Sequence, residues 1–245
     1  MNVINDIKYS EYKECLLDIY LPDSKSFCVF IYFHGGGLES GDKAEAQVIA
    51  EYLTEKKVAV VSANYRMYPK SKYPDYITDA AECVSWVFSN INNYGTCDNI
   101  YVGGSSAGAY LSMMLCFDSQ YLLKHGISPT QISGYVHDSG QPTSHFNILR
   151  EKDIDQRRVI IDETAPLYHV GKEKDYSNIV FIVSDNDLPN RYEQIILLKS
   201  TLKHFGHHSD IEVLHGTHSQ YIQAKNEGKS VLGEVIGKYI KKWKN

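Results

Sequence analysis

Cysteine is scarce in this 245-residue sequence, and its five cysteines follow no pattern. Their number is odd, they are scattered, and no Cys-x-x-Cys pair occurs. Neither a disulfide framework nor a zinc site fits this arrangement. We therefore expect reduced, mostly buried thiols and no metal site; the cysteines are Cys15, Cys28, Cys83, Cys97 and Cys116.

The sequence also lacks a basic excess and any long apolar run. Its 25 basic and 30 acidic residues give a formal net charge of −5, which argues against a nucleic-acid-binding protein. No stretch approaches the roughly 20 apolar residues of a membrane span, and residues 1–18 contain no apolar run of signal-peptide length. We expect a cytoplasmic protein with no nucleic-acid or membrane partner. Its lysine-rich C-terminal tail is expected to be the solvated end of a last helix.

Strand and helix patterns alternate along most of the chain. Near-continuous apolar runs predict buried strands, and apolar residues at three- and four-residue intervals predict helices. The alternation predicts an α/β fold, with a mostly parallel central sheet covered by helices on both faces, in one domain over residues 1–245. The expected strands are 16–20, 27–33, 58–63, 99–103, 132–137, 179–183 and 211–214, and the expected helices are 44–57, 75–91, 107–117, 190–205 and 219–242. The charge-rich segment 139–175 breaks this rhythm, and we expect it to form a small, cap-like helical excursion at one edge of the sheet.

The strongest chemical signal is the pentapeptide Gly104-Ser105-Ser106-Ala107-Gly108. It fits the pattern Gly-x-Ser-x-Gly, and it stands between an expected strand and an expected helix, as a nucleophile elbow requires. The two glycines are the small neighbours that so sharp a turn needs. Taken alone, the pentapeptide could also be a simple helix cap and turn. In the functional interpretation Ser106 is the nucleophile, and Ser105 fills the variable position.

A second motif, His34-Gly35-Gly36-Gly37, directly follows the expected strand 27–33. Acyl transfer creates an oxyanion that backbone N–H groups must approach closely, and glycine permits that approach. We expect Gly35, Gly36 and Ala107 to donate to this oxyanion. A run of glycines could alone be a flexible turn, but its order and spacing relative to Ser106 favour the functional interpretation.

A serine nucleophile needs a base, and the base needs a carboxylate that orients it. Two loops after expected strands offer two candidates each: Asp185 and Asp187, then His215 and His218. Both loops follow carboxyl ends of strands, where such sheets gather their active sites. Asp187 is favoured because it lies further beyond its strand and can reach across to the other loop. His218 is favoured because His215 continues its strand, whereas His218 stands in the loop just before an expected helix.

Together these residues resemble the α/β-hydrolase superfamily, in particular the hormone-sensitive-lipase-like carboxylesterases and the small feruloyl/acetyl-xylan esterase and kynurenine-formamidase-like branch. Segments 17–22 and 64–69, together with Asp79 and Trp86, extend the resemblance beyond the motifs. It implies a carboxylic-ester hydrolase with Ser106, Asp187 and His218 as catalytic triad. Two departures concern the substrate pocket. Ser105 stands where the lipase-like esterases usually have aspartate, and we expect their N-terminal cap to be missing because only about fifteen residues precede the first expected strand.

The sequence therefore predicts a serine carboxylesterase that hydrolyses small acyl or aryl esters through an acyl-enzyme, with no cofactor or metal. Its partner is expected to be a small-molecule ester. An aryl formamidase would use the same residues on an amide, and a non-catalytic ligand receptor on the same fold would typically have lost a member of the triad. The natural substrate and the oligomeric state do not follow from the sequence, although exposed sheet edges leave room for a homo-oligomer.

Overall fold

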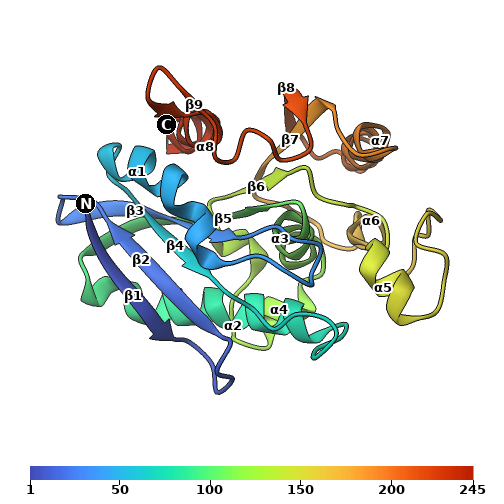
Figure 1. Cartoon of the computed structure of the whole chain (residues 1–245), viewed down its shortest axis with the longest axis horizontal. Helices are drawn as coiled ribbons and strands as arrows, with labels where there is room; N and C mark the ends of the chain where they lie inside the picture. The colour runs from blue at the N-terminus through green and yellow to red at the C-terminus, as the bar shows by residue number, and fades with distance from the viewer. Residues whose placement is uncertain (245) are drawn as a thin grey trace.

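A computed structural model describes residues 1–244 and is built around one eight-stranded sheet (Figure 1). The strand order is β1-β2-β4-β3-β5-β6-β7-β8, and only the pairs β1–β2 and β2–β4 are antiparallel. The mostly parallel sheet is therefore confirmed. The strands are β1 (Asn2–Lys8), β2 (Leu16–Leu21), β3 (Ser26–Phe33), β4 (Val58–Ala63), β5 (Thr96–Ser105), β6 (Gly134–Asp138), β7 (Asn178–Asn186) and β8 (Asp210–Thr217).

Helices cover both faces of the sheet, as the near-continuous apolar strands require. One apolar core joins the sheet to α2 and α3, and a second core joins its other face to α1 and α8 (Figure 1). The helices are α1 (Gln47–Glu55), α2 (Asp75–Asn90), α3 (Ala107–Phe117), α4 (Gln120–Leu123), α5 (Phe146–Glu151), α6 (Pro166–His169), α7 (Arg191–His204) and α8 (Val231–Lys244). Short 3-10 turns are η1 (Lys43–Ala46), η2 (Ile91–Asn93) and η3 (Pro129–Gln131).

Two elements differ from the sequence prediction. Strand β1 was not predicted, because it is mostly exposed and lacks an apolar run. The last helix was predicted over 219–242 but begins only at Val231, after a short hairpin of β9 (Lys225–Asn226) and β10 (Lys229–Ser230). The backbone has positive φ at Ser219 (59°), Glu227 (48°) and Gly228 (79°), so the chain turns repeatedly where a continuous helix was expected.

The C-terminal helix is tied to the sheet edge rather than simply solvated. Lys242 Nζ lies 2.7 Å from a carboxylate oxygen of Asp210 on β8, and Lys238 pairs with Glu212 on the same strand. The indole of Trp243 lies against Gly134, where any side chain would collide with it. The lysines therefore serve partly as surface ion pairs.

The cysteines are free in the structure, and four of them are buried while Cys97 is half-buried. None of the helices in residues 1–244 combines the length and the apolar character needed to cross a membrane. Segment 139–175 contains the two short helices α5 and α6 and no strand; its predicted cap-like role stays a prediction.

Candidate active site

Ser106 occupies a strained turn between β5 and α3. Its φ of 53° and ψ of −112° lie in a region that side chains rarely adopt. A β-carbon at position 104 would come within 2.5 Å of the carbonyl oxygen of Phe33, and one at position 108 within 1.9 Å of the same atom. Glycine is thus required on both sides of the serine, because the turn presses against the end of β3.

The structure brings Ser106, His218 and Asp187 together in one hydrogen-bonded chain. Ser106 Oγ lies 2.9 Å from His218 Nε2, and His218 Nδ1 lies 2.6 Å from Asp187 Oδ1. The side chain of Asp187 is 1% exposed and that of His218 is 20% exposed. A nucleophile, a base and an orienting carboxylate are therefore in mutual contact, with the base partly open to solvent.

Asp187 is held by four donors. Oδ1 accepts from His218 and from the backbone N–H of Leu188 at 2.7 Å, while Oδ2 accepts from Ser139 Oγ at 2.7 Å and from Ser184 N–H at 3.2 Å. Burial by itself raises the pKa of Asp187, but the hydrogen bonds from His218 and Ser139 outweigh it and lower the pKa to about 2. Asp187 is therefore a carboxylate near neutral pH.

The two residues that the sequence disfavoured form a pair of their own. His215 Nδ1 lies 2.6 Å from Asp185 Oδ2, with side chains 97% and 43% exposed. The backbone N–H of Gly216 also donates to Asp185, and this bond is the first cause that lowers its pKa. Both candidate pairs exist, but only Asp187–His218 reaches Ser106.

The glycine loop lies directly beside the elbow, since a β-carbon at position 35 would be 3.5 Å from Ser106 Cβ. One expected donor is engaged elsewhere: Gly35 N–H donates to Glu45 Oε1 at 3.1 Å. In this structure the N–H of Gly35 thus anchors the loop, and its predicted donation to an oxyanion stays a prediction. The N–H groups of Gly36 and Ala107 have no hydrogen-bond acceptor within residues 1–244. Gly36 has a φ of +102°, and a side chain there would meet Ser40 O at 2.1 Å.

Buried aromatic and polar groups fix the glycine loop from behind. The ring of His34 stacks on Tyr65 with centroids 4.4 Å apart, and Tyr65 O–H donates to the His34 carbonyl at 2.9 Å. Burial lowers the pKa of His34, so this histidine is neutral and structural. From α5, Asn147 Nδ2 donates to Gly37 O at 2.8 Å. The excursion 139–175 therefore contacts the loop directly.

A second buried carboxyl, which was not predicted from the sequence, lies beneath the elbow. Asp138 ends β6, and its backbone carbonyl accepts the N–H of Ser106 at 2.7 Å. Its Oδ1 lies 2.6 Å from the hydroxyl of Tyr221, and burial raises its pKa to about 6. Its place at the carboxyl end of a strand next to the elbow strand was the available signal. Tyr221 gave none, because its loop was expected to be helical.

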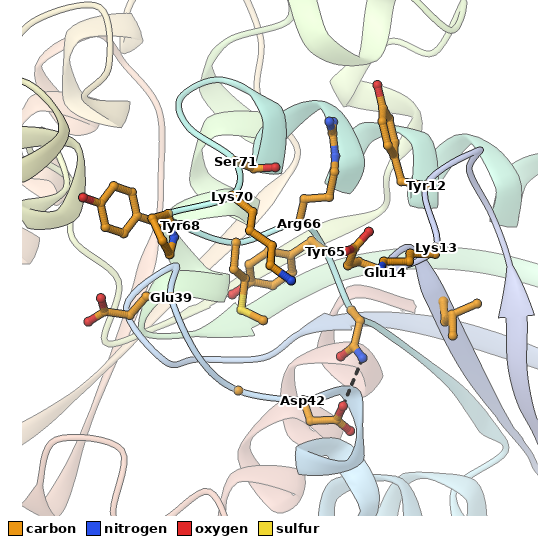
Figure 2. A pocket seen from close by; sticks show the side chains of 15 residues that line it. Tyr12, Lys13, Glu14, Glu39, Asp42, Tyr65, Arg66, Tyr68, Lys70 and Ser71 are labelled. Atoms are coloured by element: carbon orange, nitrogen blue, oxygen red, sulfur yellow. Dashed lines mark hydrogen bonds between the residues drawn. The ribbon is translucent and has the colours of Figure 1, made fainter.

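A cavity with a volume of about 640 Å³ lies elsewhere (Figure 2). Its lining comes from the loops around residues 12–16, 39–42 and 64–71, and it includes none of Ser106, His218 and Asp187. Arg66 in its wall makes a bidentate contact with Asp79, at 2.6 and 2.9 Å, and stacks on Tyr12. Arg66 is thus held in a structural ion pair with Asp79. Among residues 1–244 no cluster of three or more potential metal ligands occurs.

Known sequences are similar to the first part of the chain. The BD-FAE family model matches residues 17–147, which include the glycine loop and the elbow but neither Asp187 nor His218. The chain is 31% identical over 145 residues to a probable isoprenylcysteine alpha-carbonyl methylesterase of Arabidopsis thaliana, and 35% identical over 112 residues to kynurenine formamidase of Danio rerio. These matches cover 56% and 45% of this chain and about a third of each relative, 34% and 37%.

Solved structures with the same fold are similar over nearly the full chain. A carbohydrate esterase from gut microbiota superposes with a TM-score of 0.79 at 18% identity, covering 99% of this chain and 96% of that one. Esterase 2 of Thermogutta terrifontis gives 0.81 at 18% identity, covering 98% and 94%. At such identities the likeness concerns the fold. With the family model matching more than half of its residues, the chain belongs to the BD-FAE family, an esterase family with the α/β-hydrolase fold.

Proposed function

We propose that this protein is a serine carboxylesterase that cleaves small acyl or aryl esters through an acyl-enzyme intermediate. The observation that carries the proposal is the contact of Ser106 Oγ with His218 Nε2 at 2.9 Å, with His218 held by Asp187 at 2.6 Å. A serine hydroxyl is a weak nucleophile until an adjacent base accepts its proton, and this geometry supplies that base.

Each residue has a distinct task in the proposed reaction. Asp187 accepts the Nδ1–H of His218, which leaves Nε2 free to take the proton of Ser106 as its oxygen attacks the ester carbonyl. The imidazolium that forms then faces a carboxylate and donates its proton to the departing alcohol. Water, activated by the same histidine, releases the acid and restores Ser106.

The tetrahedral intermediates require donors for their oxyanion. The N–H groups of Gly36 and Ala107 are proposed as the main donors. Gly35 is proposed to contribute only where its N–H leaves Glu45, to which it donates in this structure. Ala107 is the first residue of α3, so the positive end of the helix dipole supports the same charge.

A small substrate is proposed because α5 covers part of the glycine loop that lies beside Ser106. Gly37 in the neighbouring loop lies under Phe146 of α5, whose ring would be 3.0 Å from a β-carbon at position 37. The 640 Å³ cavity does not include Ser106 in its lining. Relatives described as a methylesterase and as the carboxylic ester hydrolase LipM of Mycobacterium tuberculosis are in keeping with an ester substrate.

A second candidate is an aryl formamidase, which the 35% identity to a kynurenine formamidase over 112 residues favours specifically. The same serine, histidine and aspartate would attack a formyl amide. What separates the two functions is the leaving group: an alcohol or phenol in one and an arylamine in the other.

The test is a substrate panel run on the wild type and on Ser106→Ala. It contains p-nitrophenyl esters from acetate to decanoate, methyl ferulate and N-formylkynurenine. We expect turnover of the shortest esters and a loss on the order of 10⁴-fold or more in Ser106→Ala. Preference for N-formylkynurenine would move the assignment to a formamidase. Ester turnover that survives Ser106→Ala would contradict the mechanism.

A further inference from the structure

Three short oxygen–oxygen contacts connect the buried Asp138 to Asp187. Asp138 Oδ1 lies 2.6 Å from Tyr221 Oη, Tyr221 Oη lies 3.0 Å from Ser139 Oγ, and Ser139 Oγ lies 2.7 Å from Asp187 Oδ2. All four side chains are buried or nearly so. The chain runs beneath the elbow from the end of β6 to the loop after β7.

The number of protons in this chain is fixed by chemistry. Each of the three contacts needs one hydrogen to be attractive, and Tyr221 and Ser139 each carry a single hydroxyl proton. If both carboxyls were ionised, two protons would serve three contacts. The contact between Tyr221 and Ser139 would then have no hydrogen, and two oxygen lone pairs would face each other at 3.0 Å. A third proton, placed on one of the two carboxyl groups, gives every contact a hydrogen.

Asp187 is the wrong place for that proton. It receives four donors, His218 and Ser139 among them, and hydrogen bonding to the charged form favours ionisation. Asp138 has the opposite environment. Its Oδ2 is buried and has no hydrogen-bond partner among residues 1–244. An ionised carboxylate would leave negative charge on that unpaired oxygen, whereas a neutral acid would leave only a carbonyl.

We propose that Asp138 is a positioning residue that carries this third proton. With it in place, every hydrogen bond in the series Asp138, Tyr221, Ser139, Asp187 is donated toward Asp187. Asp138 donates to Tyr221, Tyr221 donates to Ser139, and Ser139 donates to Asp187. The consequence for catalysis rests on the proposed function, because Asp187 orients His218. Asp138 itself touches none of the reacting atoms.

The charges around Asp138 make its proton sensitive to mildly acidic pH. Burial raises its pKa to about 6, the neighbouring hydroxyls of Ser105 and Tyr221 and the nearby His218 oppose the rise, and the Asp187 charge supports it. On β3, Tyr32 also faces Asp138, and the pKa of Tyr32 is raised by burial and in part by that carboxyl. As the pH rises through this range, Asp138 becomes ionised and Tyr221 turns its proton toward it. The contact between Tyr221 and Ser139 then loses its hydrogen.

The direct test is a titration of the wild-type protein labelled with ¹³C at the aspartate carboxyl carbons, followed by NMR without substrate. We expect one resonance to titrate near pH 6 and to be missing in Asp138→Asn. If that variant does not fold, Tyr221→Phe identifies the resonance by moving its midpoint upward, because the phenol no longer stabilises the ionised form. A chemical shift showing that the Asp138 carboxyl is already ionised at pH 5 would overturn the proposal.

Kinetics give a second readout. Asparagine can donate from Nδ2 to Tyr221 as the neutral acid does, so Asp138→Asn is expected to keep kcat within about threefold of the wild type, less than the effect of one lost hydrogen bond. At pH 5, where Asp138 holds its proton in the wild type, Tyr221→Phe breaks the chain and is expected to lower kcat about tenfold with KM unchanged. Equal losses in the two variants would overturn the proposal. The NMR titration needs no turnover, so its failure and a failure of the esterase assignment are distinguishable.

Discussion

The molecule contains two aspartate–histidine pairs at the carboxyl ends of the same two strands. Asp185–His215 joins the last residues of β7 and β8, and Asp187–His218 joins the loops that follow them. Each pair has a 2.6 Å contact between a carboxylate oxygen and Nδ1. Their surroundings differ. His215 is 97% exposed, whereas His218 is 20% exposed and its other ring nitrogen contacts Ser106.

The difference shows that contact distance alone does not make a pair catalytic. A contact between exposed side chains is screened by water and contributes little, while a carboxylate that is 1% exposed acts on its histidine through a medium of lower dielectric. The buried pair also has partners that fix it, namely Ser139, Ser184 and Leu188. The exposed pair is therefore a natural control for the buried one.

The largest expected difference between the two pairs is in the effect of replacing their histidines. His218→Ala removes the base, and we expect kcat for p-nitrophenyl acetate to fall by roughly 10⁴-fold or more. The matched variant His215→Ala removes an exposed ring and is expected to stay within about twofold of the wild type, as surface changes usually do. Similar losses in both variants would mean that the contact with Ser106 does not decide function.

The aspartates allow a finer comparison. Asp187→Asn keeps the size of the side chain but favours the wrong tautomer of His218, so we expect kcat to fall on the order of 10³- to 10⁴-fold. Asp185→Asn changes only the exposed pair and is expected to alter kcat less than about twofold. Steady-state kinetics at pH 8 would check both. A loss in Asp185→Asn as large as that in Asp187→Asn would refute the distinction.

Asp138 offers a smaller effect, on stability. A carboxyl whose pKa is raised on folding to about 6 binds its proton more tightly in the folded state than in the unfolded one. Its contribution to stability is present below the unfolded pKa of about 4 and falls as the pH rises to about 6, by up to about 3 kcal/mol. Urea unfolding should therefore show that the free energy of unfolding of Asp138→Asn increases relative to that of the wild type as the pH rises from 4 to 7. A constant difference over this range would contradict the raised pKa.

The sequence predicted the fold and indicated candidate site residues because both follow from local patterns. Apolar runs such as 27–33 and 58–63 mark buried strands, and the glycines at 104 and 108 mark a turn too tight for side chains. The triad assignment stays a prediction until it is tested, although the structure places its three members in contact. The cytoplasmic location and the oligomeric state also stay predictions.

What the sequence did not predict depends on contacts between distant residues. Glu45 takes the N–H of Gly35 because η1 folds back over the glycine loop, and no spacing rule encodes that contact. Tyr221 meets Asp138 across 83 positions of sequence, and the predicted helix over 219–242 obscured the turn that carries it. Apolar spacing alone could not place the start of α8, because residues with positive φ interrupt the segment before it.

The most direct test of the central claim, that His218 and not His215 activates Ser106, is covalent labelling by a fluorophosphonate. The wild type, His215→Ala and His218→Ala would be treated with the probe, and the modified peptide would be located by mass spectrometry. The account predicts rapid labelling of Ser106 in the wild type and in His215→Ala, and a loss of labelling in His218→Ala. Labelling at another residue, or equal labelling of Ser106 in all three proteins, would contradict it.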